Sequence, residues 1–441
     1  MPYTPDQTPD IMPARHPEKT PTLLFANSAG EIKDFPELLM AGRSGSRFYR
    51  PKAEELIPLP EGSDIFVLPG RNPVGIDPES GEPLLLAENP ENPQEGIQAV
   101  AAFMAPAHTA IHWAAFEKSA GNLAHLPLFA YTAVGWLDGQ FWVSAFRSDP
   151  DKRQEAKRFE PEKLRRRTEH LLKNNEQNRL IQHLGKCCLT YRCPAAINYF
   201  LGKFEAPLPT SPACNAQCIG CISLQPSGCC PSTQERIKFV PTPKEIAEIA
   251  VPHLNKVKGG IASFGQGCEG EPLLQADTIE KAILLIRKQT RLGTVNLNSN
   301  ASLPEAVARL AHAGLDSIRV SMNSARPEYH QRYYRPKNFD LADIKQSIRV
   351  MKQHKRFVSL NYFILPGFTD DPGEFAALCE LIADCNPDFI QLRNLNMDPD
   401  WYFDSIRFAE SGEPKGILAW HRQLKKLFPR LRYGYFNPPL R

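Results

Sequence analysis

The strongest constraint on the fold is an alternation of strand-like and helix-like segments that begins at residue 205. Strand patterns occur at 205–211, 260–265, 294–298, 317–322, 357–364 and 388–393, and helical patterns lie between them at 243–257, 275–290, 303–313, 340–354 and 373–385. This alternation predicts a parallel sheet with right-handed crossovers. Six such units are too few for a closed eight-stranded barrel, so we expect an α/β fold with a partial (β/α)6 barrel over residues 205–400.

The remaining sequence divides into three regions around this barrel. Residues 1–150 carry strand patterns at 63–69, 126–137 and 140–146, and Asp138-Gly139 is a hairpin turn signal, so we expect a smaller β-rich N-terminal domain of unknown role. Residues 151–204 predict a charged helix, with Pro161 in its first turn, and a cysteine-bearing linker. Residues 401–441 predict a basic C-terminal extension that packs on the barrel.

Composition and charge exclude the extreme classes of protein. Apolar residues make up 42% of the chain, which is enough to fill hydrophobic cores, and the formal net charge of +3 is too mild to require a nucleic-acid or membrane partner. The most apolar stretch, 97–116, is interrupted by Pro106 and two histidines, so it indicates a buried helix or strand pair. The first twenty residues lack the apolar core of a secretory signal. We therefore expect a cytoplasmic protein.

The cysteines are unevenly distributed. Nine of the eleven lie between residues 187 and 268. An odd number of cysteines in a long chain without a secretory signal argues against a disulfide framework. Clustering of this kind instead indicates a metal site.

The central motif is Cys214-x3-Cys218-x2-Cys221, directly after the first predicted barrel strand. Three thiolates on one short loop can hold three irons of a [4Fe–4S] cluster, and the fourth iron is then free to bind a small molecule. In this β/α context the motif resembles that of the radical S-adenosylmethionine (SAM) superfamily. The resemblance covers about residues 205–400 and leaves the subfamily open.

A second segment supports this resemblance. Gly270-Glu271-Pro272 follows the second predicted strand and is similar to the superfamily's Gly-Gly-Glu-Pro motif, which binds the methionyl amino group of SAM. Glycine lets backbone approach a ligand closely, and a carboxylate suits an ammonium group. Glu269 stands where the motif has its first glycine, so either Glu269 or Glu271 could face SAM. The motif register favours Glu271.

Polar residues at the tips of the third and fourth predicted strands complete the implied SAM site. The resemblance implies that Ser299, Asn300, Ser321 and Asn323 bind the ribose hydroxyls and the methionine carboxylate of SAM. Each could equally be an ordinary strand-end cap. On the sixth strand Gln391 and Arg393 share one face, which could point into the substrate space.

The resemblance also implies an activity. A reduced [4Fe–4S] cluster would cleave SAM into methionine and a 5′-deoxyadenosyl radical, which abstracts hydrogen from a substrate that the sequence does not identify. The implied partners are SAM and an electron donor such as flavodoxin or ferredoxin, with RNA as one open substrate class.

Six further cysteines lie near the motif: Cys187, Cys188, Cys193, Cys229, Cys230 and Cys268. Some of them could hold an auxiliary Fe–S cluster or a zinc ion, although their spacing matches no established ligand pattern. Cys379 and Cys385 lie on a predicted helix and are expected to be core residues.

Two other functions remain open from the sequence. One is a non-enzymatic iron–sulfur electron carrier, which would need neither the Gly-Glu-Pro turn nor the polar strand tips. The other is a zinc-stabilised RNA-binding protein, because residues 421–441 combine six Lys/Arg with several aromatic residues and no Asp or Glu.

Overall fold

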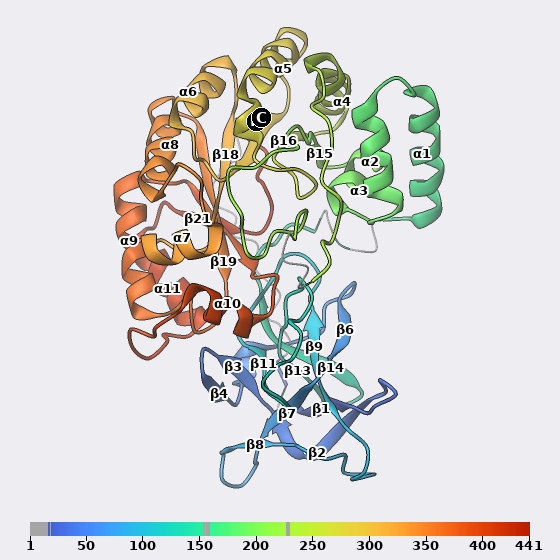
Figure 1. Ribbon diagram of the computed structural model, residues 1–441, viewed down its shortest axis with the longest axis vertical. Coiled ribbons are helices and arrows are strands. Elements are labelled where there is room, and N and C mark those ends of the chain that lie inside the picture. Colours follow the sequence, from blue (N-terminus) through green and yellow to red (C-terminus); the bar gives the residue numbers. More distant parts are fainter. Residues whose placement is uncertain (1–15, 18, 153–154, 156–158, 226–229) are drawn as a thin grey trace.

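The computed structural model describes residues 16–17, 19–152, 155, 159–225 and 230–441. Figure 1 shows a β-rich N-terminal part, coloured blue to cyan, at one end of the molecule and a helix-covered sheet, yellow to red, at the other. Three green helices lie beside that sheet. No helix within the described residues is both long enough and apolar enough to cross a membrane.

The second half of the chain forms a seven-stranded parallel sheet. Its strands are, in spatial order, β15 (Glu205–Pro207), β16 (Ile261–Phe264), β17 (Thr294–Ser299), β18 (Ser317–Met322), β19 (Phe357–Ile364), β20 (Phe389–Asn394) and β21 (Arg432–Gly434). The helices that connect and cover them are α4 (Pro243–Lys256), α5 (Ala276–Gln289), α6 (Pro304–Ala313), α7 (Pro327–Tyr334), α8 (Leu341–Gln353), α9 (Pro372–Cys385), α10 (Pro399–Ile406) and α11 (Ile417–Leu427), with a short 3-10 helix η3 (Pro272–Gln275) after β16. The predicted α/β fold with an open parallel barrel is confirmed.

The sheet differs from the prediction at its two edges. β15 ends at Pro207, earlier than the predicted 211, because Pro207 and Pro209 have no N–H group to continue the ladder. β21 is a seventh strand within the segment that was predicted to be an extension. Its three residues, Arg-Tyr-Gly, contain no apolar run that would identify a strand.

The sheet has an apolar outer face and a polar inner face. On β18, Ile318, Val320 and Met322 are fully buried in the main core, which also contains the apolar faces of the helices. Arg319 and Ser321 alternate with them and therefore face the barrel interior, where both remain partly accessible.

A hydrogen-bonded network of short polar side chains lines the other side of that interior. Asn296 donates to Ser263 Oγ (3.1 Å) and to Asn298 Oδ1 (2.8 Å), and it accepts from Ser317 Oγ (2.7 Å). Because every member has a partner, this network rigidifies the middle of the barrel.

The N-terminal part consists of antiparallel strands. Eleven of them form one sheet: β1 (Thr22–Ala26), β2 (Ile32–Met40), β5 (Leu56–Pro58), β6 (Asp64–Leu68), β7 (Arg71–Ile76), β8 (Pro83–Leu85), β9 (Gln98–Phe103), β10 (His108–Ala110), β12 (Phe116–Lys118), β13 (Val134–Leu137) and β14 (Gln140–Arg147). A smaller sheet contains β3 (Gly42–Ser44), β4 (Arg47–Tyr49) and β11 (Trp113–Ala114), and a 3-10 helix η1 (Ala53–Glu55) precedes β5.

Sequence predictions for this region are largely confirmed. β6 and β14 match the predicted strands at 63–69 and 140–146, whereas only the end of 126–137 is a strand. Asp138 and Gly139 both have positive φ (51° and 78°), as a two-residue hairpin turn requires. The apolar stretch 97–116 is a set of largely buried strands, not a helix.

Three helices connect the two parts: α1 (Pro161–Asn174), α2 (Arg179–Leu189) and α3 (Pro194–Leu201). α1 begins at Pro161 as predicted. α2 begins after Asn178, whose side chain accepts the N–H of Ile181 at 3.0 Å. The ion pair between Arg179 and Glu245 of α4 (2.8 Å) joins α2 to the barrel.

The N-terminal part contacts the barrel where β19 and β20 end. At the tip of β20, Asn394 accepts the N–H of Ala110 (2.9 Å) and donates to the carbonyl of His108 (3.1 Å). Beyond it, Arg71 and Asp398 form an ion pair at 3.1 Å with both side chains almost fully buried. Since parallel barrels carry their chemistry at the carboxyl ends of the strands, the N-terminal part covers one side of that edge.

Candidate active site

The three motif cysteines lie on the loop that follows β15. Cys214, Cys218 and Cys221 are all partly buried. Burial raises the pKa of the Cys214 thiol, and it raises that of Cys218 well above its usual value, with a further contribution from the neighbouring thiols. Without a metal these thiols stay protonated, whereas iron would compensate the charge of the thiolates.

The spacing of these thiols suits a cluster better than a single ion. In the described part of the chain, one group of three His, Cys or carboxylate ligand atoms lies within 4.8 Å of one another. That group does not include Cys214, Cys218 or Cys221. A cubane takes one thiolate per iron, so its ligands lie further apart than those of a mononuclear site. The Cys214, Cys218 and Cys221 thiols lie outside this limit but within electrostatic range of one another, which is compatible with a [4Fe–4S] cluster.

Arg236 adds a positive charge beside this loop. Its Nη2 lies 3.5 Å from Cys221 Sγ, and its Nε donates to Ser223 Oγ at 3.1 Å. A guanidinium in this position favours a thiolate and an anionic cluster. The sequence pattern did not identify Arg236, because it lies outside the motif.

Backbone hydrogen bonds fix the cysteine loop against two neighbours. On one side, the N–H groups of Gln217 and Ile219 donate to the carbonyls of Tyr334 and Tyr333, at the end of α7, at 2.9 and 3.1 Å. On the other side, the N–H of Gly270 donates to Ser211 O at 2.7 Å. The loop is thus held between α7 and the turn after β16.

Gly270 is required by this close approach. A Cβ added at Gly270 would lie 1.9 Å from the carbonyl oxygen of Ala213, which is far inside a van der Waals contact. The next residue, Glu271, donates its N–H to the same oxygen at 2.8 Å. The sequence predicted that glycine lets the backbone approach a ligand closely, whereas the close approach in the structure is to the backbone of the cysteine loop.

Two buried carboxylates follow each other in this turn. Glu271 accepts from Ser299 Oγ (2.6 Å), the Asn300 N–H (2.9 Å) and the Leu273 N–H (3.0 Å). Burial raises the pKa of the Glu271 carboxyl to about 7. Glu271 is also close enough to Cys214 to raise the pKa of that thiol further, after the larger effect of burial. The Glu271 carboxylate thus lies between the tip of β17 and the cysteine loop.

Glu269 is held in a similar manner by a different part of the chain. It accepts the N–H groups of Thr210 (2.7 Å), Ser211 (2.9 Å) and Gln266 (2.7 Å). Burial raises its pKa to about 7 as well. All three donors are backbone groups at the entrance of the cysteine loop and in the turn, so Glu269 stabilises the backbone of the site.

The four predicted strand-tip residues separate into two groups. Ser299 and Asn300 both contact Glu271, and Asn300 also donates to Asn215 of the cysteine loop at 2.9 Å. Ser321 faces the barrel interior and is partly accessible. Asn323 is fully buried and donates to Tyr402 Oη at 3.1 Å, so it belongs to an aromatic cluster. Pro272 is buried and begins η3.

Two arginines face the interior on the far side of the barrel. Arg319 donates to Gln391 Oε1 at 3.1 Å, and Arg393 donates to the carbonyl of Tyr435 at 3.2 Å with its guanidinium 4.2 Å from the ring centroid. Neither forms an ion pair with a described carboxylate. Burial, and then the charge of Arg393, lower the pKa of Arg319 to about 10, so it is still protonated at neutral pH. The carboxylate of Glu205 lies within electrostatic range of Arg319 and offsets part of the positive charge on this side of the barrel.

The sequence from β15 to α9 matches a known family. Residues 208–379 match the family model of the Radical SAM superfamily. The chain carries a radical SAM domain. The matched range includes the cysteine loop, the Glu269–Glu271 turn and the tips of β17 and β18. The resemblance inferred from the motifs is therefore confirmed, and the subfamily remains open.

Two curated relatives of the radical SAM domain are both named GTP 3′,8-cyclase. The one from Aquifex aeolicus is 28% identical over 223 residues, which are 48% of this chain and 64% of the relative. The one from Lactiplantibacillus plantarum is 24% identical over 162 residues, which are 36% of this chain and 45% of the relative. The chain thus spans less than two thirds of the length of either relative.

Solved structures similar to this chain include a radical SAM methyltransferase and a methylornithine synthase. A radical SAM methyltransferase from Sphaerobacter thermophilus has a TM-score of 0.36 at 14% identity. The match covers 52% of this chain and 66% of the methyltransferase chain. Methylornithine synthase has a TM-score of 0.37 at 13% identity, with 62% of this chain and 78% of the other covered.

The remaining cysteines do not form one group. Cys188 Sγ lies 3.6 Å from Thr168 Oγ1, and Cys230 is buried in the aromatic cluster that contains Tyr131. Cys229 lies outside the described residues. Among the described cysteines, Cys187 and Cys268 lie close together, Cys193 is within electrostatic range of both, and Cys188 is within electrostatic range of Cys187 and Cys193. Cys385 is buried in the main core, as predicted, and Cys379 packs against it.

Proposed function

We propose that this protein is a radical SAM enzyme in which Cys214, Cys218 and Cys221 hold a [4Fe–4S] cluster with one iron left open for SAM. The observation that carries the proposal is the position of Glu271, which is hydrogen-bonded to the tip of β17 and lies within electrostatic range of Cys214. When bound, such a cluster supplies the electron that cleaves SAM into methionine and a 5′-deoxyadenosyl radical, which abstracts hydrogen from the substrate.

The residues around Glu271 then bind and orient SAM. The carboxylate of Glu271 would accept from the methionyl ammonium, and Gly270 and Pro272 would shape the turn beside it. Ser299, Asn300 and Ser321 offer hydroxyl and amide groups to the ribose and the methionine carboxylate. Asn323 would act from further away, through Tyr402.

For the substrate, we propose a molecule with an anionic group, phosphate or carboxylate. Arg319 and Arg393 place two guanidinium groups in the barrel interior, neither in a direct ion pair with a described carboxylate, and guanidinium forks match both phosphate and carboxylate. GTP, named for the two curated relatives, is itself a polyanion. For this chain the proposal extends only to the charge of the substrate.

This charge proposal predicts a difference between ligands. Nucleoside triphosphates should raise the melting temperature of the reconstituted protein, and the matching uncharged nucleosides should not. Arg393→Gln should remove the shift. If a panel of phosphates and carboxylates causes no shift in the parent protein, the substrate is not recognised by charge.

The electron donor is proposed to be flavodoxin or ferredoxin, and the location is proposed to be the cytoplasm, where free thiols and reduced clusters are maintained. An RNA-binding role of the C-terminal segment receives less support. The ring of Tyr435 is covered by Arg393, Tyr433 packs on the main core, and Arg441 forms an ion pair with Asp316 at 2.6 Å.

Anaerobic reconstitution tests the proposed enzyme. The protein should bind about four irons at the cysteine loop and, with SAM and dithionite, release 5′-deoxyadenosine slowly even without substrate. Changing Cys214, Cys218 and Cys221 together to Ala should abolish both, whereas Cys385→Ala should retain them. A reconstituted, reducible cluster that neither binds SAM nor cleaves it would instead indicate an electron carrier.

A further inference from the structure

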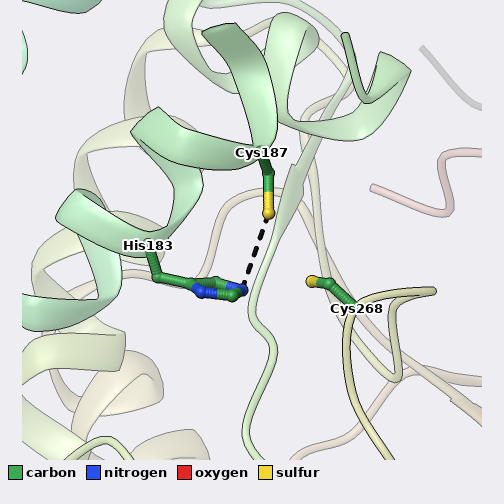
Figure 2. A group of neighbouring side chains, drawn as sticks. All are labelled: His183, Cys187 and Cys268. Carbon is green, nitrogen blue, oxygen red and sulfur yellow. Dashed lines mark hydrogen bonds between the residues drawn. The ribbon is translucent and has the colours of Figure 1, made fainter. Parts of the chain in front are cut away.

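A second set of metal-ligand side chains lies beside the cysteine loop. His183, Cys187 and Cys268 bring their ligand atoms within 4.8 Å of one another. Cys187 Sγ lies 3.6 Å from His183 Nε2. Figure 2 shows the two α2 side chains and Cys268 pointing toward one common space from different sides.

The local structure explains why these three side chains converge. His183 and Cys187 are four residues apart on α2, so they lie on the same face of the helix. Cys268 belongs to the turn between β16 and η3, and its carbonyl accepts the N–H of Ile237 at 2.7 Å, which fixes the turn. Both cysteines are almost fully buried.

We propose that His183, Cys187 and Cys268 bind a single zinc ion, which joins α2 to the turn that carries Glu269 and Glu271. Imidazole nitrogen and thiolate sulfur are the ligands that zinc prefers in structural sites. The three atoms are close enough for one ion to reach all of them, unlike the wider Cys214, Cys218 and Cys221 set, where each thiolate would bind its own iron.

Cys193 is the candidate for the fourth ligand, and its Sγ lies outside the group of three ligand atoms. It interacts electrostatically with both Cys187 and Cys268. Its N–H also donates to the carbonyl of Cys187 at 3.0 Å, so the start of α3 is held against the end of α2. Structural zinc sites are closed and four-coordinate, so a Cys3His site requires the Cys193 side chain to move inward when zinc binds.

The zinc site has a specific structural consequence. Glu269 directly follows Cys268 and holds the backbone of Thr210 and Ser211, which lead into the cysteine loop. A zinc ion at Cys268 would therefore anchor the base of the proposed SAM-binding turn. It would do so without contributing a ligand to the cluster or to SAM.

The test uses the full-length protein with Cys214, Cys218 and Cys221 all changed to Ala, so that iron at the loop does not interfere. After anaerobic purification this parent should contain about one zinc ion per chain. Adding His183→Ala or Cys268→Ser should weaken zinc binding roughly tenfold or more in competition with a chromophoric chelator. Cys188→Ser, next to Cys187 on α2 but facing Thr168, is the matched control and should leave zinc binding unchanged.

A second measurement is made on the parent alone, so it does not depend on whether the zinc-ligand variants fold. In the parent, Cys187 and Cys268 should resist alkylation while zinc is bound and become modified after chelation, whereas labelling of Cys385, a buried core thiol, should not change. The proposal is overturned if Cys268→Ser keeps its zinc, if the site holds iron with sulfide, or if mass spectrometry finds a Cys187–Cys268 disulfide in the anaerobic protein. Unchanged labelling of Cys268 after chelation would overturn it too.

Discussion

The effect of Glu271 on SAM binding can be separated from its effect on the stability of the turn by comparing Glu271→Gln with Glu269→Gln. Glu269 lies two residues away and is the matched control. Both carboxyls are buried, each accepts three hydrogen bonds, and burial raises the pKa of each to about 7. A carboxamide keeps one acceptor oxygen but places an NH2 group against at least one donor. Each variant should therefore lose about 1–3 kcal/mol of stability.

The effect on SAM should differ between the two variants. Glu271 contacts Ser299 and Asn300 and lies near Cys214, whereas the donors to Glu269 are all backbone N–H groups. A charge-assisted bond to the methionyl ammonium contributes about 1.5–3 kcal/mol, so Glu271→Gln should weaken SAM binding roughly ten- to a hundredfold. Glu269→Gln should weaken it by no more than about threefold.

The assay is calorimetric titration of SAM into the oxidised, reconstituted cluster of each variant, with urea denaturation as the measure of stability. Cluster content must be equal in both variants, as checked by iron analysis. Equal losses of SAM affinity, or a larger loss in Glu269→Gln, would refute the assignment of Glu271 to the ammonium.

Three further changes have expected results. Gly270→Ala should destabilise the protein by roughly 1–3 kcal/mol and lower its iron content, whereas Gly96→Ala, with nothing within 4 Å of the added Cβ, should do neither. Burial lowers the pKa of His112 to about 4, so its contribution to stability is present above pH 6.5 and is lost as the pH falls through 4; His112→Gln should reduce the acid-induced loss in the free energy of unfolding by about 3 kcal/mol. Asp398→Asn should leave the buried Arg71 charge unpaired and cost about 3–5 kcal/mol by urea denaturation.

The barrel could be predicted from sequence because its units are local. The predicted strands carry apolar residues in runs or in alternation, and several helices begin with a local signal, such as Thr242 and Asp340 capping α4 and α8. The N-terminal sheet is different, since β1 pairs with β13 through Thr22 and Trp136, more than a hundred residues apart. Pairing at that separation depends on the whole sheet, so strand patterns alone could not give its order.

The candidate site likewise combines features that local sequence predicts with features that depend on long-range packing. The cysteine motif and the Gly270-Glu271 pair are contiguous in sequence and could be found by spacing alone. Arg236 and His183 could not, because each becomes a neighbour of the site only after α2 and the loop before α4 pack on the barrel. His183 and Cys187 are four residues apart, but the sequence predicts a linker at Cys187, so this spacing did not indicate that they share a helix face.

The polar atoms of the barrel interior indicate how the two sides of the site differ. On the SAM side, the buried side chains of Glu271, Asn296 and Ser299 all have hydrogen-bond partners, so this side is assembled by the protein itself. On and next to β18 and β19, in contrast, Arg319 Nε and Asn361 Oδ1 are buried without one. Burying such groups unpaired is costly, and native proteins usually retain them where a ligand or water supplies the partner. The unpaired atoms lie on the same side as the two arginines, which supports the proposal that an anionic ligand binds at this side of the barrel.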